Sequence, residues 1–420
     1  MNVKDVNNMI FYSDYLGIRI GGPSGYIANL KDAIANYVGE ERIAVISRED
    51  VAAFQDKSRK KYTFQKTLAR CLTFYIPSKT YRKHLRNQIL RRLLKTTTFD
   101  YLDLDAVSYA GYADLLNQYN FKTITCHSTR DAIFIKNYLR SQNKQARLLL
   151  MSHTPELPSQ EMYHLEKQAR NPWAKSICRI WEQIEQKAFN LADILIFPTK
   201  EAMEPYLAGA DYFKTLAQTK DIRFIPTGCA PIDLKGSAVD IRKDHNITTK
   251  HIISFIGRHT KIKGYDRLKE IGNIVLNQRD DVTFVIGGTQ TSEFTPLNHA
   301  RWIELGRINP ADLLKISDLF ILPNKQTYFD LILLEVLSTG VPVIASNTGG
   351  NKSVYQATRA ITLYDTIEEC VDQINAFIDS TDENKQKRRL LAAEAYTNNY
   401  TLSHFAKNYD HLIATIIGEE

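Results

Sequence analysis

The feature that most constrains the fold is an alternation of short β-rich runs with longer helical patterns in both halves of the chain. Such alternation indicates parallel strands joined by crossover helices, because parallel neighbours need a long connection. The pattern appears twice, so we predict an α/β protein built from two Rossmann-like, doubly wound domains. The predicted strands are 9–12, 43–47, 122–126, 147–151 and 194–197 in the first half, and 251–256, 282–286, 319–322, 342–345 and 360–363 in the second.

The length of 420 residues fits two or three domains, at roughly 100–200 residues each. Pro226, Gly228 and Pro231 interrupt the pattern, which predicts a boundary within 221–234. We therefore expect an N-terminal domain at 1–222 and a C-terminal domain at 223–400. A last amphipathic helix at 402–417 could pack back on the first domain. Open α/β sheets bind ligands at the carboxyl ends of their strands, so a cleft is expected where the two domains face each other.

Composition excludes several classes of protein. Apolar residues make up 44% and charged residues 24% of the chain, close to the averages for soluble globular proteins. No apolar run approaches the roughly 20 residues that span a bilayer, and the first residues lack the apolar core of a signal peptide. The five cysteines are scattered and form no Cys-x-x-Cys pair, which argues against a zinc site or a disulfide framework. We expect a cytoplasmic protein without a metal site.

A basic segment stands out at 57–95, which holds thirteen Lys or Arg residues and no Asp or Glu. Aromatic residues and leucines are interleaved with the cations, a mixture that suits an anionic membrane surface. The segment therefore predicts peripheral binding at the inner face of the plasma membrane. A solvated pair of basic helices is the alternative. A nucleic-acid site is not expected, because the chain has no zinc finger, RNA-recognition signature or basic zipper.

Two glycine-containing loops could hold phosphate. Residues 21–25 read Gly-Gly-Pro-Ser-Gly before a helical run, where free N–H groups and close backbone approach favour an anion. Residues 255–264 follow a predicted strand and carry Arg258 and Lys263 near its carboxyl end. A forked guanidinium and a point charge together suit a diphosphate. The alternatives are an ordinary turn and a solvated basic turn.

A third loop, 323–330, leads from a predicted strand into an apolar helix that contains Glu335. A carboxylate in such a run needs a partner or a ligand, because burying it unpaired is costly. A structural salt bridge is the alternative for Glu335. Two histidines, His127 and His153, directly follow predicted strands of the first domain. A loop carbonyl could equally satisfy either ring.

In this order the loops resemble retaining glycosyltransferases of the GT-B fold, family 4 in particular. The resemblance covers most of the chain and is densest at 225–351. Its motifs are Ile-Pro-Thr-Gly at 225–228, Gly257-Arg258 with Lys263-Gly264, Gly287-Gly288, the Glu335 helix with Gly-x-Pro-Val, and Glu185 with Ala188 and Ala192-Asp193. The runs 327–331 and 348–352 look like enzymes that build bacterial capsule, exopolysaccharide or other cell-surface glycans.

The resemblance implies transfer of a sugar from a nucleotide-diphosphate sugar to an acceptor, with retention at the anomeric carbon and without a metal or another cofactor. Arg258 and Lys263 would bind the diphosphate, and Glu335 the ribose hydroxyls. Gly22 would let the backbone approach the phosphates. His153, or else His127, would lie near the donor sugar. The remaining donor contacts would come from Ile308 on the base and from Tyr328, Phe329 and Leu331 on phosphate and sugar.

One departure from the family pattern concerns the donor sugar. The family usually has a glutamate eight positions before Glu335, and this chain has Thr327 there. Asp330 stands where the family usually has glycine, and it could supply the missing carboxylate as a catalytic residue. A UDP-sugar is expected as donor ahead of a GDP-sugar, with a lipid-linked or other glycan as acceptor. A non-catalytic GT-B subunit, a sugar-nucleotide epimerase and a homo-oligomer all stay open.

Overall fold

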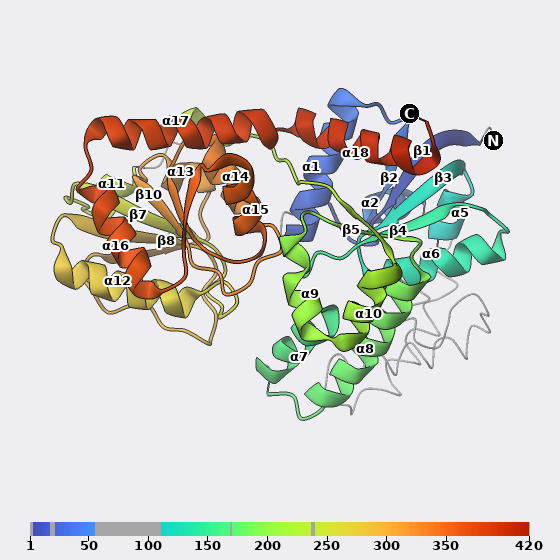
Figure 1. Ribbon diagram of the computed structural model, residues 1–420, viewed down its shortest axis with the longest axis horizontal. Helices are drawn as coiled ribbons and strands as arrows, with labels where there is room; N and C mark the ends of the chain where they lie inside the picture. The colour runs from blue at the N-terminus through green and yellow to red at the C-terminus, as the bar shows by residue number, and fades with distance from the viewer. Residues whose placement is uncertain (1–2, 17–21, 55–110, 169, 237–239, 420) are drawn as a thin grey trace. The chain divides into compact units, whose positions relative to one another are not determined.

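The computed structural model describes residues 3–16, 22–54, 111–168, 170–236 and 240–419 (Figure 1). The basic segment 57–95 and Gly21 lie outside the described residues. The chain forms two compact units. The first comprises Met1–Phe197, Pro205–Ile225 and Ala406–Glu420, and the second comprises Pro198–Glu204 and Pro226–Phe405. Each unit is described separately below.

The first unit contains a parallel sheet whose described strands follow the order β2-β1-β3-β4-β5-β6. Apolar side chains fill the sheet, since the β4 residues Leu148–Met151 and all four residues of β5 are buried. The strands are β1 (Lys4–Phe11), β2 (Ile43–Ile46), β3 (Tyr119–Cys126), β4 (Arg147–Met151), β5 (Ile194–Phe197) and β6 (Asp221–Phe224).

Helices connect these strands, and their starts follow from local side chains. Ser128 caps α6, because its hydroxyl accepts a hydrogen bond from the Asp131 N–H. The described helices before β6 are α1 (Gly22–Tyr37), α2 (Arg48–Phe54), α5 (Tyr112–Leu116), α6 (Thr129–Ser141), α7 (Pro158–Gln168), α8 (Ala174–Leu191), α9 (Glu204–Gly209) and α10 (Asp211–Thr219), with a 3₁₀ turn η2 at Glu201–Met203.

The second unit is a six-stranded parallel sheet in the order β12-β11-β10-β7-β8-β9. Counted from β7, this is the strand order 3-2-1-4-5-6 of a Rossmann fold, so the strand order reverses between β7 and β10. The strands are β7 (His251–Ile256), β8 (Val282–Gly287), β9 (Trp302–Gly306), β10 (Leu319–Leu322), β11 (Val343–Ser346) and β12 (Ile361–Tyr364).

Helices cover both faces of the second sheet (Figure 1). One apolar cluster joins α12 and α16 to the sheet, and another joins α14 and α17 to its other face. The helical elements after β6 are η3 (Leu234–Gly236), α11 (Ile241–Asp244), α12 (Tyr265–Gln278), α13 (Pro310–Leu314), α14 (Leu331–Ser338), α15 (Gly349–Thr358), α16 (Ile367–Ile378), α17 (Asp382–Asn399) and α18 (Leu402–Ile417).

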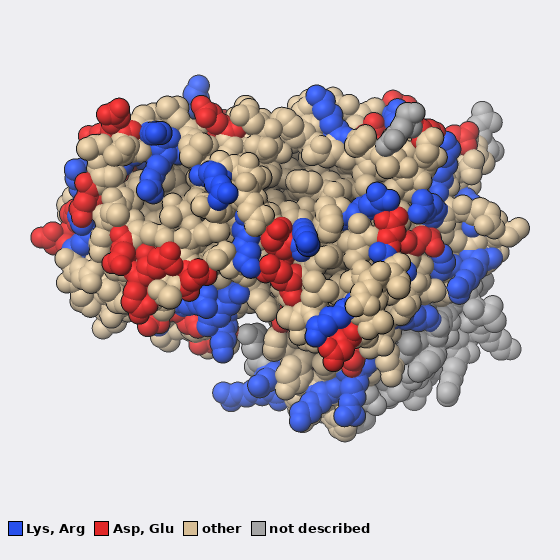
Figure 2. Space-filling model, in the orientation of Figure 1, with Lys and Arg blue, Asp and Glu red and all other residues tan. Residues whose placement is uncertain are grey.

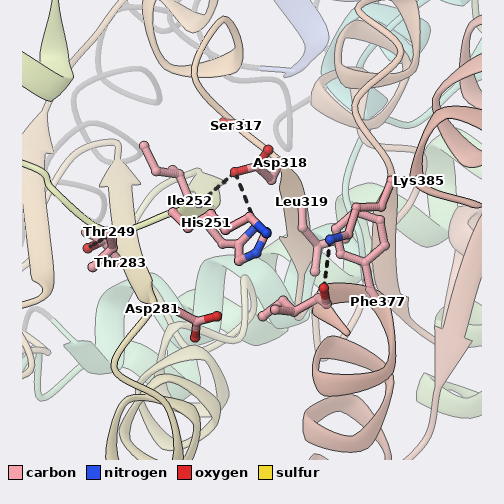
Figure 3. Close-up of polar contacts among 12 residues, drawn as sticks. Thr249, His251, Ile252, Asp281, Thr283, Ser317, Asp318, Leu319, Phe377 and Lys385 are labelled. Atoms are coloured by element: carbon pink, nitrogen blue, oxygen red, sulfur yellow. Dashed lines mark hydrogen bonds and ion pairs between the residues drawn. The ribbon is translucent and has the colours of Figure 1, made fainter. Parts of the chain in front are cut away.

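Polar contacts at the amino edge of the second sheet join Asp318 to the start of β7 (Figure 3). The Asp318 carboxylate accepts a hydrogen bond of 2.9 Å from the Ile252 N–H and lies 4.0 Å from the buried His251 ring. From α17, Arg389 donates to the Ser317 carbonyl at 3.1 Å. Burial, with Lys385 adding in the same direction, lowers the pKa of His251. These contacts therefore hold the amino ends of β7 and β10 against α17.

The predicted α/β architecture of two Rossmann-like units is confirmed. Two strands were absent from the prediction. β6 lies inside the predicted boundary segment, and β9 lies between the predicted strands 282–286 and 319–322. Both are edge strands whose side chains are mostly half-buried, so their apolar pattern is weak. The helix predicted at 402–417 is α18, and residues from Ala406 onward group with the first unit.

Candidate functional site

The candidate site of the second unit lies where the strand order reverses. The loop 257–264 leaves the carboxyl end of β7, and the loop 323–330 leaves that of β10. Because β7 and β10 are neighbours in the sheet, the two loops meet at one edge. Their approach is close: Gly264 has φ +69°, and a Cβ there would lie 1.8 Å from the Pro323 carbonyl oxygen. Only glycine fits this position without moving the backbone.

A three-residue polar cluster joins the two loops. The Lys263 ammonium donates to one Asp330 carboxylate oxygen at 2.5 Å, and the Asn324 amide donates to the other at 2.7 Å. Lys263 and Asp330 keep 24% and 15% of their side-chain surface exposed, whereas Asn324 is fully buried. Asp330 begins α14 but makes no side-chain cap bond to the helix. Its carboxylate is therefore committed to Lys263 and Asn324.

Thr327 occupies the position of the family glutamate, and the structure buries it. Its side chain is 1% exposed, and its hydroxyl has no hydrogen-bond partner among the residues that the structure describes. Gly349 and Gly350, at the start of α15, make this possible. A Cβ on Gly349 would lie 1.9 Å from the Thr327 carbonyl oxygen, and one on Gly350 would lie 2.8 Å from that of Tyr328. The loop is thus pressed against α15 by backbone contacts.

A network of buried side chains supports the loop from below. The Ser346 hydroxyl donates to the Asn324 carbonyl at 2.6 Å, and the Asn351 amide donates to the Ser346 carbonyl at 3.0 Å. Within the described ranges, the amide oxygens of Asn324 and Asn351 are buried without a hydrogen-bond partner. Buried polar atoms without a hydrogen-bond partner are uncommon, because each one lowers the stability of the folded state. With the Thr327 hydroxyl, three such atoms belong to the loop 323–330 and to the start of α15.

The other predicted donor residues occupy the same edge or its surroundings. Arg258 follows β7 with an exposed side chain, and Glu335 is half-buried in α14. Tyr328 is buried, whereas Phe329 and Leu331 are half-buried at the loop end and helix start. Their roles in donor binding stay predictions.

Two residues near β8 and β7 have clear packing partners. Ile308 packs against the end of β8, since a Cβ on Gly287 would lie 2.8 Å from the Ile308 Cγ2. His259 is buried, stacks on the Tyr265 ring with centroids 4.2 Å apart, and lies 3.6 Å from the Glu304 carboxylate. Burial lowers the pKa of His259, and Glu304 opposes that shift. His259 thus belongs to the packing of α12 on the sheet.

In the first unit the structure brings both predicted histidines together. His127 and His153 follow β3 and β4, and His127 Nδ1 lies 2.8 Å from His153 Nε2. The Tyr26 ring packs on both, with centroids 4.7 Å from His153 and 5.6 Å from His127. Burial lowers the pKa of both rings, and for His127 the neighbouring His153 adds to the effect. One neutral ring therefore donates to the other.

Gly22 begins α1, and a Cβ built on it meets nothing within 4 Å. Close packing within the described first unit therefore does not require glycine at this position.

Asn324 and Asn351 are the polar residues that sequence reasoning missed. The signal that could have found Asn324 is its place two residues after the buried strand β10, because polar residues at the carboxyl ends of parallel strands often face a ligand.

The described residues contain no group of three or more His, Cys, Asp or Glu that could hold a metal ion. In those same ranges, no helix combines the length and apolar character needed to cross a bilayer.

Comparison with known proteins agrees with this geometry. Residues 250–380, which include both loops, match the model of glycosyl transferases group 1. A sucrose-phosphate synthase from Thermosynechococcus elongatus aligns with TM-score 0.63 and 14% identity over 99% of this chain and 100% of that one. Anabaena Alr3699/HepE, solved with UDP and glucose, aligns with TM-score 0.59 and 15% identity over 97% and 99%. The fold is GT-B.

Two curated proteins are similar over part of their length. Spore coat protein SA of Bacillus subtilis (strain 168) is 23% identical over 181 residues, which is 38% of this chain and 48% of that protein. D-inositol 3-phosphate glycosyltransferase of Corynebacterium jeikeium (strain K411) is 26% identical over 205 residues, 43% and 46% of the two chains. The chain thus spans about half the length of the curated relatives it matches.

Proposed function

We propose that this protein is a retaining glycosyltransferase that moves a hexosyl or N-acetylhexosaminyl group from a nucleotide-diphosphate sugar to a glycan acceptor. The observation that carries the proposal is the cluster of Lys263, Asn324 and Asp330 at the strand-order reversal. It lies inside the region that matches group 1 glycosyl transferases. Positioning and charge stabilisation would account for most of the rate enhancement.

The donor diphosphate would bind above Lys263 and Arg258, with Glu335 on the ribose. In the described structure the Lys263 ammonium already contacts the Asp330 carboxylate. A diphosphate brings more negative charge to that ammonium than one carboxylate does, so it would share or displace the contact. The free N–H groups at the start of α14 would add to phosphate binding, because the Asp330 side chain does not occupy them.

Asp330 would replace the carboxylate that the family has at the position of Thr327. The buried Thr327 side chain is poorly placed to bind a sugar hydroxyl. Asp330, partly exposed and held by Asn324, keeps an acceptor oxygen at the site edge. A UDP-sugar is the preferred donor, and the solved structures with similar folds include one that holds UDP and glucose.

The acceptor would be a lipid-linked oligosaccharide used for capsule, exopolysaccharide or another surface glycan. Segment 57–95 would then bind the anionic inner face of the plasma membrane, since its cations and aromatic residues suit such a surface. His127 and His153 would lie on the acceptor side of the donor sugar. Their neutral rings can donate or accept a hydrogen bond without adding charge.

A non-catalytic GT-B subunit that stabilises an active partner is the second candidate. The burial of Thr327, with no carboxylate at its position, favours it. The two candidates differ in what they require of Lys263: a transferase needs its charge for the donor, whereas a stabilising subunit does not.

The test is calorimetric titration with UDP, GDP, ADP and CMP, followed by transfer assays with sugars of the nucleotide that binds. Lys263→Ala and Glu335→Ala should each weaken binding of one nucleoside diphosphate. Lys261→Ala, an exposed lysine of the same loop, is the matched control and should leave binding unchanged. If no nucleotide binds, the transferase proposal fails, and a non-catalytic GT-B subunit becomes the favoured function.

A further inference from the structure

The helical hairpin of α7 and α8 carries an exposed tip with an unusual combination of side chains. Leu165 and Trp173 are each 47% exposed. Between Lys167 and Trp181 the sequence has four cations and no acidic residue. All four cations are exposed: Lys167, Arg170, Lys175 and Arg179. The nearest preceding carboxylate, Glu166, is buried and accepts a hydrogen bond from Asn171. The tip is therefore both basic and apolar.

The hairpin projects from the edge of the first sheet that bears the two histidines. Glu185, midway along α8, accepts hydrogen bonds from the Ser159 N–H at 2.7 Å and hydroxyl at 2.8 Å, at the start of α7. The chain reaches Ser159 from the carboxyl end of β4, past His153. Residues 174–184 of α8 therefore extend beyond that level, by about 15 Å at 1.5 Å per residue. Figure 2 shows Lys and Arg side chains gathered toward the free ends of these helices.

We propose that this tip docks on an anionic lipid surface, with Trp173 and Leu165 entering the headgroup region and the four cations binding lipid phosphates. Charge complementarity selects this occupant: an exposed tryptophan beside several exposed cations is typical of the interface between a bilayer and water. A tryptophan ring has an apolar body and an N–H that can stay hydrated. A neutral protein partner would leave four cations without counter-charges.

The consequence concerns the acceptor. A tip that enters the headgroups would hold the His127 and His153 edge of the first sheet facing the bilayer, where a lipid-linked acceptor presents its sugar. This inference deepens the proposed function and rests on it for the acceptor. Lipid binding itself is measured without donor or acceptor, so failure of docking and failure of transfer are distinguishable.

The experiment is co-sedimentation of the full chain with phosphatidylcholine vesicles, with and without phosphatidylglycerol. Each cation near an anionic surface contributes about fivefold in affinity. Lys175→Gln with Arg179→Gln should therefore lower affinity for the anionic vesicles about 25-fold. Trp173→Ser should lower it about tenfold. Added salt should weaken the wild type more than the two-cation variant.

The matched control removes two exposed cations elsewhere in the first unit, with Arg140→Gln and Lys407→Gln. It should bind vesicles nearly as the wild type does, because only cations at the surface contribute. Tryptophan quenching by brominated lipid should fall in Trp173→Phe, a change that keeps an apolar ring.

Three outcomes would overturn the proposal. Wild-type chain that fails to bind anionic vesicles excludes docking altogether. Binding that is unchanged in the tip variants, yet lost when cations in 57–95 are neutralised, assigns docking to that segment alone. Self-association that is lost in Trp173→Ser, without vesicle binding, makes the tip an interface between copies of the chain.

Discussion

The buried Glu185 makes the stability of the first unit depend on pH in a direction that can be worked out. Its side chain is fully buried and accepts hydrogen bonds from Ser159 and, at 2.8 Å, from the Tyr212 hydroxyl. Burial dominates over these bonds and raises the pKa of Glu185 from 4.5 to about 7. Between these values the folded chain holds a proton that the unfolded chain has lost, so stability falls as pH rises.

The magnitude follows from the two pKa values. One pKa unit corresponds to 1.36 kcal/mol, so the change from 4.5 to about 7 is worth about 3 kcal/mol. This contribution is fully present below pH 4.5 and is lost as pH rises through about 7. Glu185→Gln removes the titration and keeps an oxygen that can accept from the Ser159 N–H. The wild type should therefore lose about 3 kcal/mol relative to this variant across that range.

The assay is urea unfolding of both proteins at a series of pH values, with the transition of the first unit followed separately. Glu182→Gln is the control, because Glu182 is an exposed glutamate one turn earlier on α8. The control should follow the wild type at every pH. If the stability of Glu185→Gln also changes with pH as that of the wild type does, the three hydrogen-bond donors stabilise the ionised carboxylate enough to offset the effect of burial on its pKa. That result would refute the prediction.

Three further predictions concern the loops and the histidines. Gly264→Ala should lower the free energy of unfolding of the second unit by more than about 1–2 kcal/mol, whereas Gly22→Ala should change stability little; urea unfolding compares them. Burial lowers the pKa of His153, so the first unit should be most stable above about pH 6.5 and lose stability at lower pH, where the unfolded chain binds a proton at this ring. In thermal unfolding, His153→Asn should lose less stability than the wild type as the pH is lowered. Asp330→Asn should tighten nucleoside diphosphate binding severalfold, because it frees the Lys263 charge, and should slow sugar transfer; calorimetry with the transfer assay tests both.

Strands with continuous apolar runs could be predicted from the sequence, and those without could not. The runs at 147–151, 194–197, 251–256 and 319–322 correspond residue for residue to β4, β5, β7 and β10. All four lie inside their sheets, where both faces are buried. β6 is the short run Asp-Ile-Arg-Phe, whose Phe224 is 43% exposed, so its pattern does not separate an edge strand from a loop.

The loops of the candidate site could be predicted, but not which of their side chains meet. The contact of Lys263 with Asp330 spans 67 positions and depends on β7 and β10 being neighbours. Strand order is set by packing of the whole unit, which local patterns do not encode. Likewise, the meeting of His127 with His153 follows from the pairing of β3 with β4. From the sequence, each histidine could lie near the donor sugar, with His153 preferred, or bond a loop carbonyl.

The glycine contacts around the candidate site have a consequence for how such a site changes over time. Gly264 and Gly349 each lie against a carbonyl oxygen of the loop 323–330. At those two points, backbone atoms of the loop pack directly against the backbone of a glycine. The conformation of the loop there does not depend on its own side chains. A partly exposed residue such as Asp330 can then be exchanged without moving the main chain at those points. New polar groups could therefore arise at this edge of the sheet at little risk to the scaffold.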